Sequence, residues 1–134
     1  MKVALIVLTA WALLGSSPTS LTPPDPKLAR GLEVYRASYC GTCHTLSAAH
    51  THGTFGPPHD HLLRAVQRRF ADGSYKGSAK TVAAYLRESI LDPEAYLDPA
   101  YAGSRYRMPA FINLSPEDLD ALIMLLEQPC KERP

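Results

Sequence analysis

The sequence predicts a small all-α protein whose helices are joined by long loops. Apolar residues recur with the helical period in several segments, prolines and glycines separate these segments, and no segment alternates convincingly like a strand. The 134 residues leave room for one domain, and no internal repeat divides it. A net charge of +1 argues against a nucleic-acid partner.

Residues 1–20 have the layout of a secretory signal. Lys2 precedes an apolar run from Val3 to Leu14, and small polar residues follow it. The run is shorter than the roughly 20 apolar residues of a spanning helix, so an uncleaved anchor is the less favoured alternative. We expect a periplasmic or otherwise extracytoplasmic protein that contacts a membrane only through a partner or an uncleaved N-terminal segment.

A proline-rich linker is predicted at 21–26, followed by the domain at 27–129 and a C-terminal tail at 130–134. The tail holds Cys130, the odd cysteine of a chain expected to meet an oxidising compartment. A free thiol is the favoured reading of Cys130, and an intermolecular disulfide is the alternative.

The first helix of the domain leads directly into the cysteine pair. Asp25 can cap it, and Pro26 suits its first turn. One face of the predicted helix is formed by Leu28, Leu32, Tyr35 and Tyr39. The cysteines that follow should therefore lie at a helix C-terminus.

Two further helices are expected in the middle of the domain. The segment 62–70 is predicted as a short helix that ends near Gly73. The next helix has Ser78 as its candidate cap and stops at Asp92-Pro93. Its apolar face consists of Val82, Tyr85, Leu86 and Ile90.

The stretch 92–113 is predicted as a long loop, since it is rich in proline and tyrosine. Its apolar residues follow neither the helical nor the strand period. A loop of this length in a small domain usually serves a function. The last helix is capped by Ser115, has Pro116 at its first position and is expected to stop at Pro129. Its apolar face consists of Leu119, Leu122, Ile123 and Leu126.

The segment Cys40-Gly-Thr-Cys43-His44 carries the chemistry of the chain. A Cys-x-x-Cys pair suits a redox dithiol, a zinc site or covalent haem c, and only haem c requires the histidine directly after the second cysteine. A thioredoxin-like dithiol would stand at the start of a helix after a strand, which is not the predicted context. Zinc would need a fourth ligand, for which His50 or His52 is available. Haem attachment is therefore favoured: two thioethers hold the macrocycle and the imidazole of His44 meets the iron.

Met108, followed by Pro109 in the long loop, is the first candidate for a second iron ligand. Met124 falls within the last helix, where a core or surface role is favoured, and Met1 should leave with the signal. Bis-histidine ligation stays open, because four histidines lie in the loop after the motif. We expect each of them to be a surface residue that could at most hold a metal ion weakly: His50, His52, His59 and His61.

From about Pro26 to Gln128 the chain resembles class I c-type cytochromes, through the first helix, Cys40–His44, Gly56-Pro57, Met108-Pro109 and the last helix. The resemblance implies a small cytochrome c-like fold, with crossing N- and C-terminal helices and long loops wrapped around one covalently bound haem c. It implies that His44 and Met108 bind the iron and that Cys40 and Cys43 form the thioethers. It also implies that the Pro57 carbonyl accepts a hydrogen bond from the second nitrogen of His44. It also places Gly31 at the helix crossing.

The chain departs from the family pattern in two places. The last helix offers Leu122, Met124 and Leu125, rather than an aromatic residue, to meet Gly31. After the Gly-Pro turn, Pro58 to His61 precede Leu62, whereas the family usually has a leucine shortly after the turn.

A narrower likeness covers 85–111, which is similar to the cytochrome c domains fused to subunit II of haem–copper oxidases. It suggests redox partner proteins such as a terminal oxidase or a dehydrogenase. Charge is uneven along the chain, because 64–80 is basic and 88–98 is acidic. These stretches could dock a charged partner, or they could simply be two solvent-exposed faces.

The function expected from these patterns is that of an exported monohaem cytochrome, not an enzyme, which carries single electrons in a respiratory or related redox chain. The alternative is a haem-based small-ligand sensor or a peroxidase-like enzyme with a displaceable distal ligand.

Overall fold

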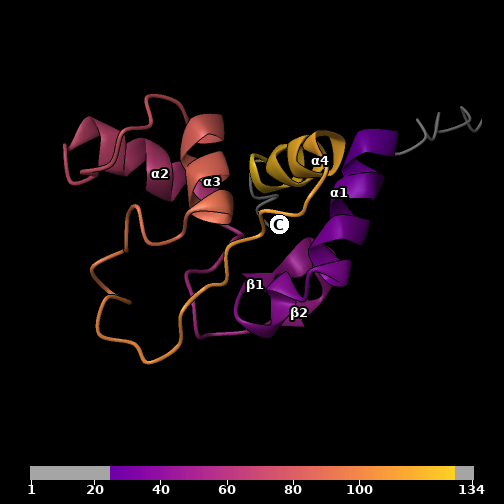
Figure 1. Cartoon of the computed structure of the whole chain (residues 1–134), viewed down its shortest axis with the longest axis horizontal. Coiled ribbons are helices and arrows are strands. Elements are labelled where there is room, and N and C mark those ends of the chain that lie inside the picture. Colours follow the sequence, from indigo (N-terminus) through magenta and orange to yellow (C-terminus); the bar gives the residue numbers. More distant parts are fainter. Residues whose placement is uncertain (1–24, 129–134) are drawn as a thin grey trace, which may run out of the picture.

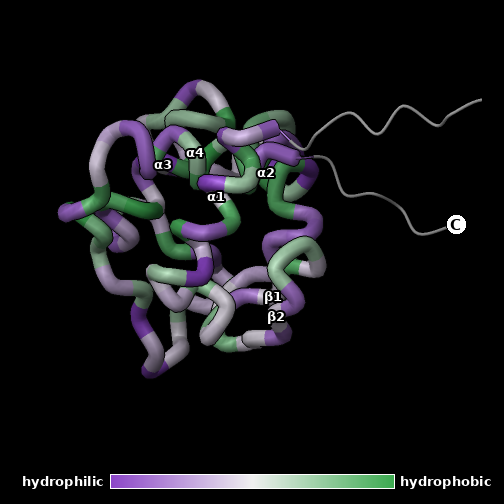
Figure 2. Tube along the Cα trace, turned by 90° about the vertical axis from the view of Figure 1, so that its right-hand side faces the viewer, coloured by the Kyte–Doolittle hydropathy of each residue, from purple (hydrophilic) through white to green (hydrophobic). Residues whose placement is uncertain are grey.

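The computed structural model describes residues 25–128, and over this range the protein is mostly helical, as predicted (Figure 1). Its elements, in chain order, are α1 (Pro26–Ala37), η1 (Cys40–Thr42), β1 (Thr45–Leu46), η2 (Ser47–Ala49), β2 (Thr51–His52), α2 (Leu62–Ala71), α3 (Val82–Leu91) and α4 (Pro116–Leu126). The helices gather in one half of the molecule and the β1–β2 hairpin lies in the other (Figures 1 and 2).

The predicted signal at 1–20, most of the predicted linker and the tail with Cys130 lie outside the described residues. Within the part that the structure describes, no helix has both the length and the apolar character needed to cross a membrane.

Two of the predicted helix caps are present. The Asp25 carboxylate accepts a hydrogen bond from the Lys27 backbone N–H (2.8 Å), and the Ser115 hydroxyl accepts one from Asp118 (3.1 Å). Each satisfies a backbone donor that the first helical turn leaves unpaired.

The cap predicted for α3 is wrong. Thr81, in extended conformation, caps this helix and accepts a hydrogen bond from the Ala84 backbone N–H (3.1 Å). Ser78 stands before the helix, where its hydroxyl donates to the Glu88 carboxylate (2.8 Å). The α4 helix also ends earlier than expected, at Leu126, so its last turn closes before Pro129 is reached.

Tyr39 does not belong to the buried face of α1. The helix ends at Ala37, and Tyr39 adopts a left-handed backbone (φ 56°) with 78% of its side chain exposed. This residue caps η1, which begins at Cys40. Tyr35, one turn earlier, is fully buried.

The helices α1 and α4 cross at Gly31, as the resemblance implied. A Cβ atom added to Gly31 would overlap the Ala121 carbonyl and lie 3.0 Å from Cβ of Leu125. Of the residues named from the sequence, Leu125 is among the nearest partners, together with the Ala121 backbone. A backbone-to-backbone approach replaces the aromatic contact of the family pattern.

The β1–β2 hairpin was not predicted. Its strands contain two residues each and pair antiparallel, with Thr45 opposite His52 and Leu46 opposite Thr51. Strands this short have no detectable period. The hairpin begins directly after His44 and therefore holds the backbone that follows the Cys40–His44 motif.

The predicted loop at 92–113 contains no helix or strand, and it is held at several points. Asp98 forms an ion pair with Arg69 of α2, and the Phe111 backbone N–H donates to the Ile90 carbonyl (3.0 Å). Aromatic rings pack edge to face where this loop meets α2 and α3: Phe70, Tyr75, Tyr85 and Tyr96. The loop is thereby anchored to the helices on both sides of Met108.

Gly31→Ala is expected to lower the free energy of unfolding by about 1–3 kcal/mol, because the methyl group forces α1 away from α4. Urea unfolding of the full chain measures this loss. Gly103→Ala is the matched control, since an added Cβ meets nothing within 4 Å there. Equal stability of the two variants would contradict a tight crossing.

Candidate functional site

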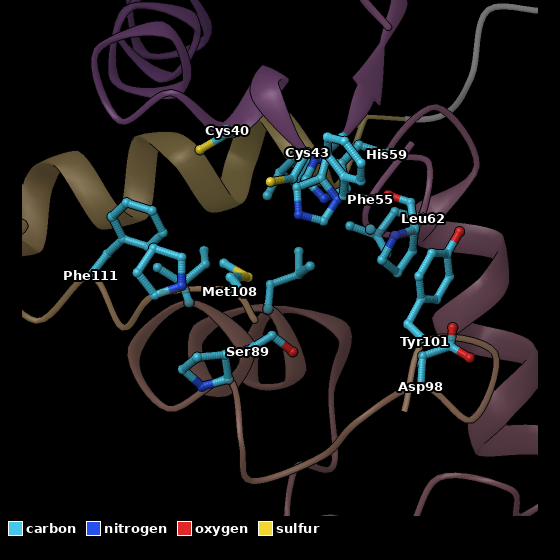
Figure 3. A pocket seen from close by; sticks show the side chains of 18 of the residues that line it. Cys40, Cys43, Phe55, His59, Leu62, Ser89, Asp98, Tyr101, Met108 and Phe111 are labelled. Carbon is cyan, nitrogen blue, oxygen red and sulfur yellow. Dashed lines mark hydrogen bonds between the residues drawn. The ribbon is translucent and has the colours of Figure 1, made fainter. Parts of the chain in front are cut away.

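A cavity of about 330 Å³ opens between η1, α3, α4 and the long loop (Figure 3). The five residues that the family resemblance assigned to the site all line it: Cys40, Cys43, His44, Pro57 and Met108. Much of the remaining wall is apolar, with Leu86, Ile90 and Leu122 among its residues. Figure 3 shows the Met108 sulfur across the space from the sulfurs of Cys40 and Cys43.

The two cysteines are placed by the turn that follows α1. The predicted position at a helix C-terminus is confirmed, because α1 ends at Ala37 and η1 begins at Cys40. The Cys40 carbonyl accepts hydrogen bonds from the backbone N–H groups of Cys43 (3.2 Å) and His44 (3.0 Å). This tight turn presents all three side chains of the motif to the same cavity.

The two thiols are not joined as a disulfide. Burial raises the pKa of the Cys40 thiol to about 11, and the neighbouring Cys43 adds to the shift. Since the thiolate is the nucleophile in disulfide exchange, this environment does not suit a redox dithiol.

His44 is buried, and its ring is held from one side by a carbonyl. Its Nδ1 lies 2.7 Å from the Pro57 oxygen, so that Nδ1–H donates and Nε2 keeps its lone pair. Burial lowers the pKa of His44, against the opposing effect of the Pro57 hydrogen bond. A neutral imidazole with a free Nε2 is the form that binds a metal.

The backbone of His44 is also fixed. Its carbonyl accepts hydrogen bonds from the Thr51 hydroxyl (3.0 Å) and the Tyr35 hydroxyl (3.4 Å). Gly53 lies against the His44 backbone, where an added Cβ would stand 2.6 Å from its nitrogen. The hairpin and α1 together therefore set the position of this residue.

The expectation that the four loop histidines are surface residues is wrong for His59. Its ring stacks on the His44 ring, with centroids 3.9 Å apart and planes inclined by 16°. The His59 backbone N–H donates to the Thr45 carbonyl (2.8 Å), which draws this part of the loop inward. No pattern in the sequence marked His59, because both contacts are tertiary.

The other three histidines, His50, His52 and His61, are exposed and do not line the cavity. Within residues 25–128, no three or more histidine, cysteine, aspartate or glutamate side chains gather as a metal-binding group. The zinc reading, which required His50 or His52 beside the motif, therefore has no support in the described structure. Met124, the other methionine weighed as a ligand, does not line the cavity either.

Sequence reasoning did not assign several cavity residues. Phe55 precedes the Gly-Pro turn, whereas Tyr101 and Tyr106 belong to the long loop. The abundance of tyrosine in that loop was visible in the sequence, but the positions that face inward depend on how the loop is anchored.

These residues fit a covalently bound haem. Two thiols and a neutral imidazole stand on one wall, a thioether stands across from them, and apolar side chains line much of the remainder. Cysteine thioethers, an axial histidine and an axial methionine are the protein groups that hold haem c.

Comparison with known proteins agrees with this chemistry. The family model described as Cytochrome c matches residues 28–128. No curated protein and no solved structure gives a significant match. The match covers most of the chain and includes every residue of the cavity, so this protein belongs to the cytochrome c family and is a haem-based electron carrier with covalently attached haem c.

Proposed function

We propose that this protein is an exported monohaem cytochrome of class I that carries single electrons in a respiratory or related redox chain. The observation that carries the proposal is the cavity that brings Met108 to face the Cys40–His44 motif. Cys40 and Cys43 would form the two thioethers, and His44 and Met108 would bind the iron. Bound there, haem c supplies the exchange of one electron between Fe(II) and Fe(III).

His44 is the proximal ligand in this proposal. The Pro57 carbonyl keeps the proton on Nδ1, which leaves the Nε2 lone pair for the iron. The Thr51 and Tyr35 hydroxyls donate hydrogen bonds to the His44 carbonyl and so hold the backbone of this residue in place.

Met108 is the distal ligand. Its loop is anchored before it by the Asp98–Arg69 ion pair and after it by the Phe111–Ile90 hydrogen bond. The Arg107 guanidinium also donates to the Ser104 carbonyl (2.5 Å) within the loop. If His44 and Met108 both bound the iron, a substrate would have no open position there, which favours a carrier over a sensor or a peroxidase-like enzyme. A neutral thioether also stabilises Fe(II).

Export and the redox chain are supported by the N-terminal pattern at 1–20 and by the likeness of 85–111 to domains fused to oxidase subunit II. The partner is a terminal oxidase or a dehydrogenase. Phe55 and Tyr106 line the cavity and are each about half exposed, so they lie at its mouth, where a partner can approach.

The basic stretch at 64–80 is only partly available to a partner. Arg69 is held by Asp98 and the Tyr85 hydroxyl, and Lys76 donates to the Gly73 carbonyl (2.7 Å). Arg68 and Lys80 are exposed, so they are better test positions than Arg69, whose replacement would also release the loop.

The attachment residues are tested by the pyridine haemochrome spectrum of protein made with haem c maturation machinery. The wild type is expected to hold one haem c that resists extraction by acidified acetone. Cys40→Ser combined with Cys43→Ser should lose all covalent haem, whereas Cys130→Ser should retain it. Extractable haem in the wild type would contradict the assignment.

Met108→Ala is expected to lower the midpoint potential, admit carbon monoxide to the reduced iron and abolish the weak red absorption band of methionine-ligated ferric haem. The physical reason is the loss of a soft, neutral donor that favours Fe(II). Met124→Ala is the matched control and should behave as wild type, because Met124 does not line the cavity. If Met108→Ala keeps the band and excludes carbon monoxide, Met108 is a packing residue only.

Oxidation of the reduced protein by ferricyanide, an anionic probe, is expected to slow as ionic strength rises. Exposed charges steer encounter only within the Debye length, which falls to ~8 Å at physiological ionic strength. Arg68→Glu combined with Lys80→Glu should lower the second-order rate several-fold at low salt, more than Lys131→Glu combined with Arg133→Glu. Stopped-flow rates that change neither with salt concentration nor with charge reversal would rule out electrostatic steering by this stretch.

A further inference from the structure

His59 has no part in the proposed function so far, yet it lies against the proposed proximal ligand. Its ring and that of His44 are nearly parallel, with centroids 3.9 Å apart, and both line the cavity. Figure 3 shows His59 beside Cys43 on the wall opposite Met108.

The position of His59 is set by groups other than His44. Its backbone N–H donates to the Thr45 carbonyl (2.8 Å), and its carbonyl accepts from the Leu62 backbone N–H (3.2 Å) at the start of α2. Its ring meets the fully buried Tyr35 ring edge to face, with centroids 5.7 Å apart and planes inclined by 74°. The His59 backbone is therefore held by β1 and the start of α2, and its ring is packed against Tyr35 of α1.

The plane of the His44 ring, in contrast, needs an additional restraint. The torsion that turns a histidine ring about its Cβ–Cγ bond is broad, so side-chain geometry alone does not define the plane. The Pro57 hydrogen bond restrains one atom of the His44 ring, Nδ1. The ring can still tilt about that atom. Gly56 approaches so closely that an added Cβ would stand 2.5 Å from Cε1 of His44. A flat neighbour stacked on the ring restrains the remaining tilt.

Packing alone does not explain a histidine at this position. The Nδ1 atom of His59 is buried and has no hydrogen-bond partner among the described protein groups. A buried polar atom without a partner is destabilising, and a leucine side chain would occupy similar space without that cost. What leucine cannot supply is a flat surface parallel to the imidazole.

We propose that His59 is a positioning residue that fixes the plane of the His44 imidazole. The inference rests on the proposed function, because it takes His44 as an axial ligand of the haem. The direction of an axial imidazole plane influences the splitting of the iron d orbitals, and groups behind the ligand orient it. His59 is such a group, and it acts by ring stacking instead of a hydrogen bond to the ligand.

The test compares His59→Leu and His59→Phe in the haem-loaded full chain, by electron paramagnetic resonance of the ferric protein. His59→Leu removes the flat surface and should shift and broaden the largest g value. His59→Phe keeps a ring and should retain the wild-type signal. His61→Leu is the control, since His61 is exposed and outside the cavity.

Two further readouts separate positioning from folding. Covalent haem and the red band of methionine ligation should persist in all variants, and the thermal midpoint of His59→Leu should equal or exceed that of the wild type. If His59→Leu does not accumulate, His59→Met, with an adaptable unbranched side chain, should give the same g shift.

A wild-type g value in His59→Leu, or an equal shift in His59→Phe, would overturn the positioning role and leave the proposed function intact. A wild-type chain without covalent haem would overturn both proposals.

Discussion

The close approach of α1 to α4 at Gly31 determines where the rest of the site is built. Because the two backbones meet at Gly31 and Ala121, the C-terminal end of α1 delivers the Cys40–His44 segment beside α4. Leu122 and Leu126 of α4 then form part of the cavity wall that the motif faces. A helix crossing thus supplies both the placement of the cysteines and much of the apolar surface around them.

The second half of the site comes from a loop that has no regular structure of its own. It depends on contacts with α2 and α3, above all the Arg69–Asp98 ion pair and the edge-to-face rings that include Tyr85 and Tyr96. Tyr85 and Tyr96 also line the cavity. Some of the side chains that anchor the loop therefore also line the cavity.

The sequence predicted features that are encoded locally and missed those that arise from tertiary contacts. The helices followed from apolar periodicity, the caps of α1 and α4 from short polar side chains, and the motif from its spacing. Ser78 was mistaken for a cap because its partner is the Glu88 side chain, ten residues further along the chain. His59 was unpredictable for the same reason, since the Thr45 carbonyl and the Tyr35 ring that place it are distant in the sequence.

The aromatic pair at the mouth of the cavity joins two segments that are far apart in the sequence. Phe55 stands next to the Gly56-Pro57 turn and Tyr106 stands two residues before Met108, and their rings lie 4.4 Å apart. The segment that contacts His44 and the segment that carries Met108 thus touch each other directly at the mouth of the cavity. If His44 and Met108 bind the iron as proposed, this contact would restrain the separation of the two ligands. On that assignment, a restrained ligand separation would keep the reorganisation energy of electron exchange small.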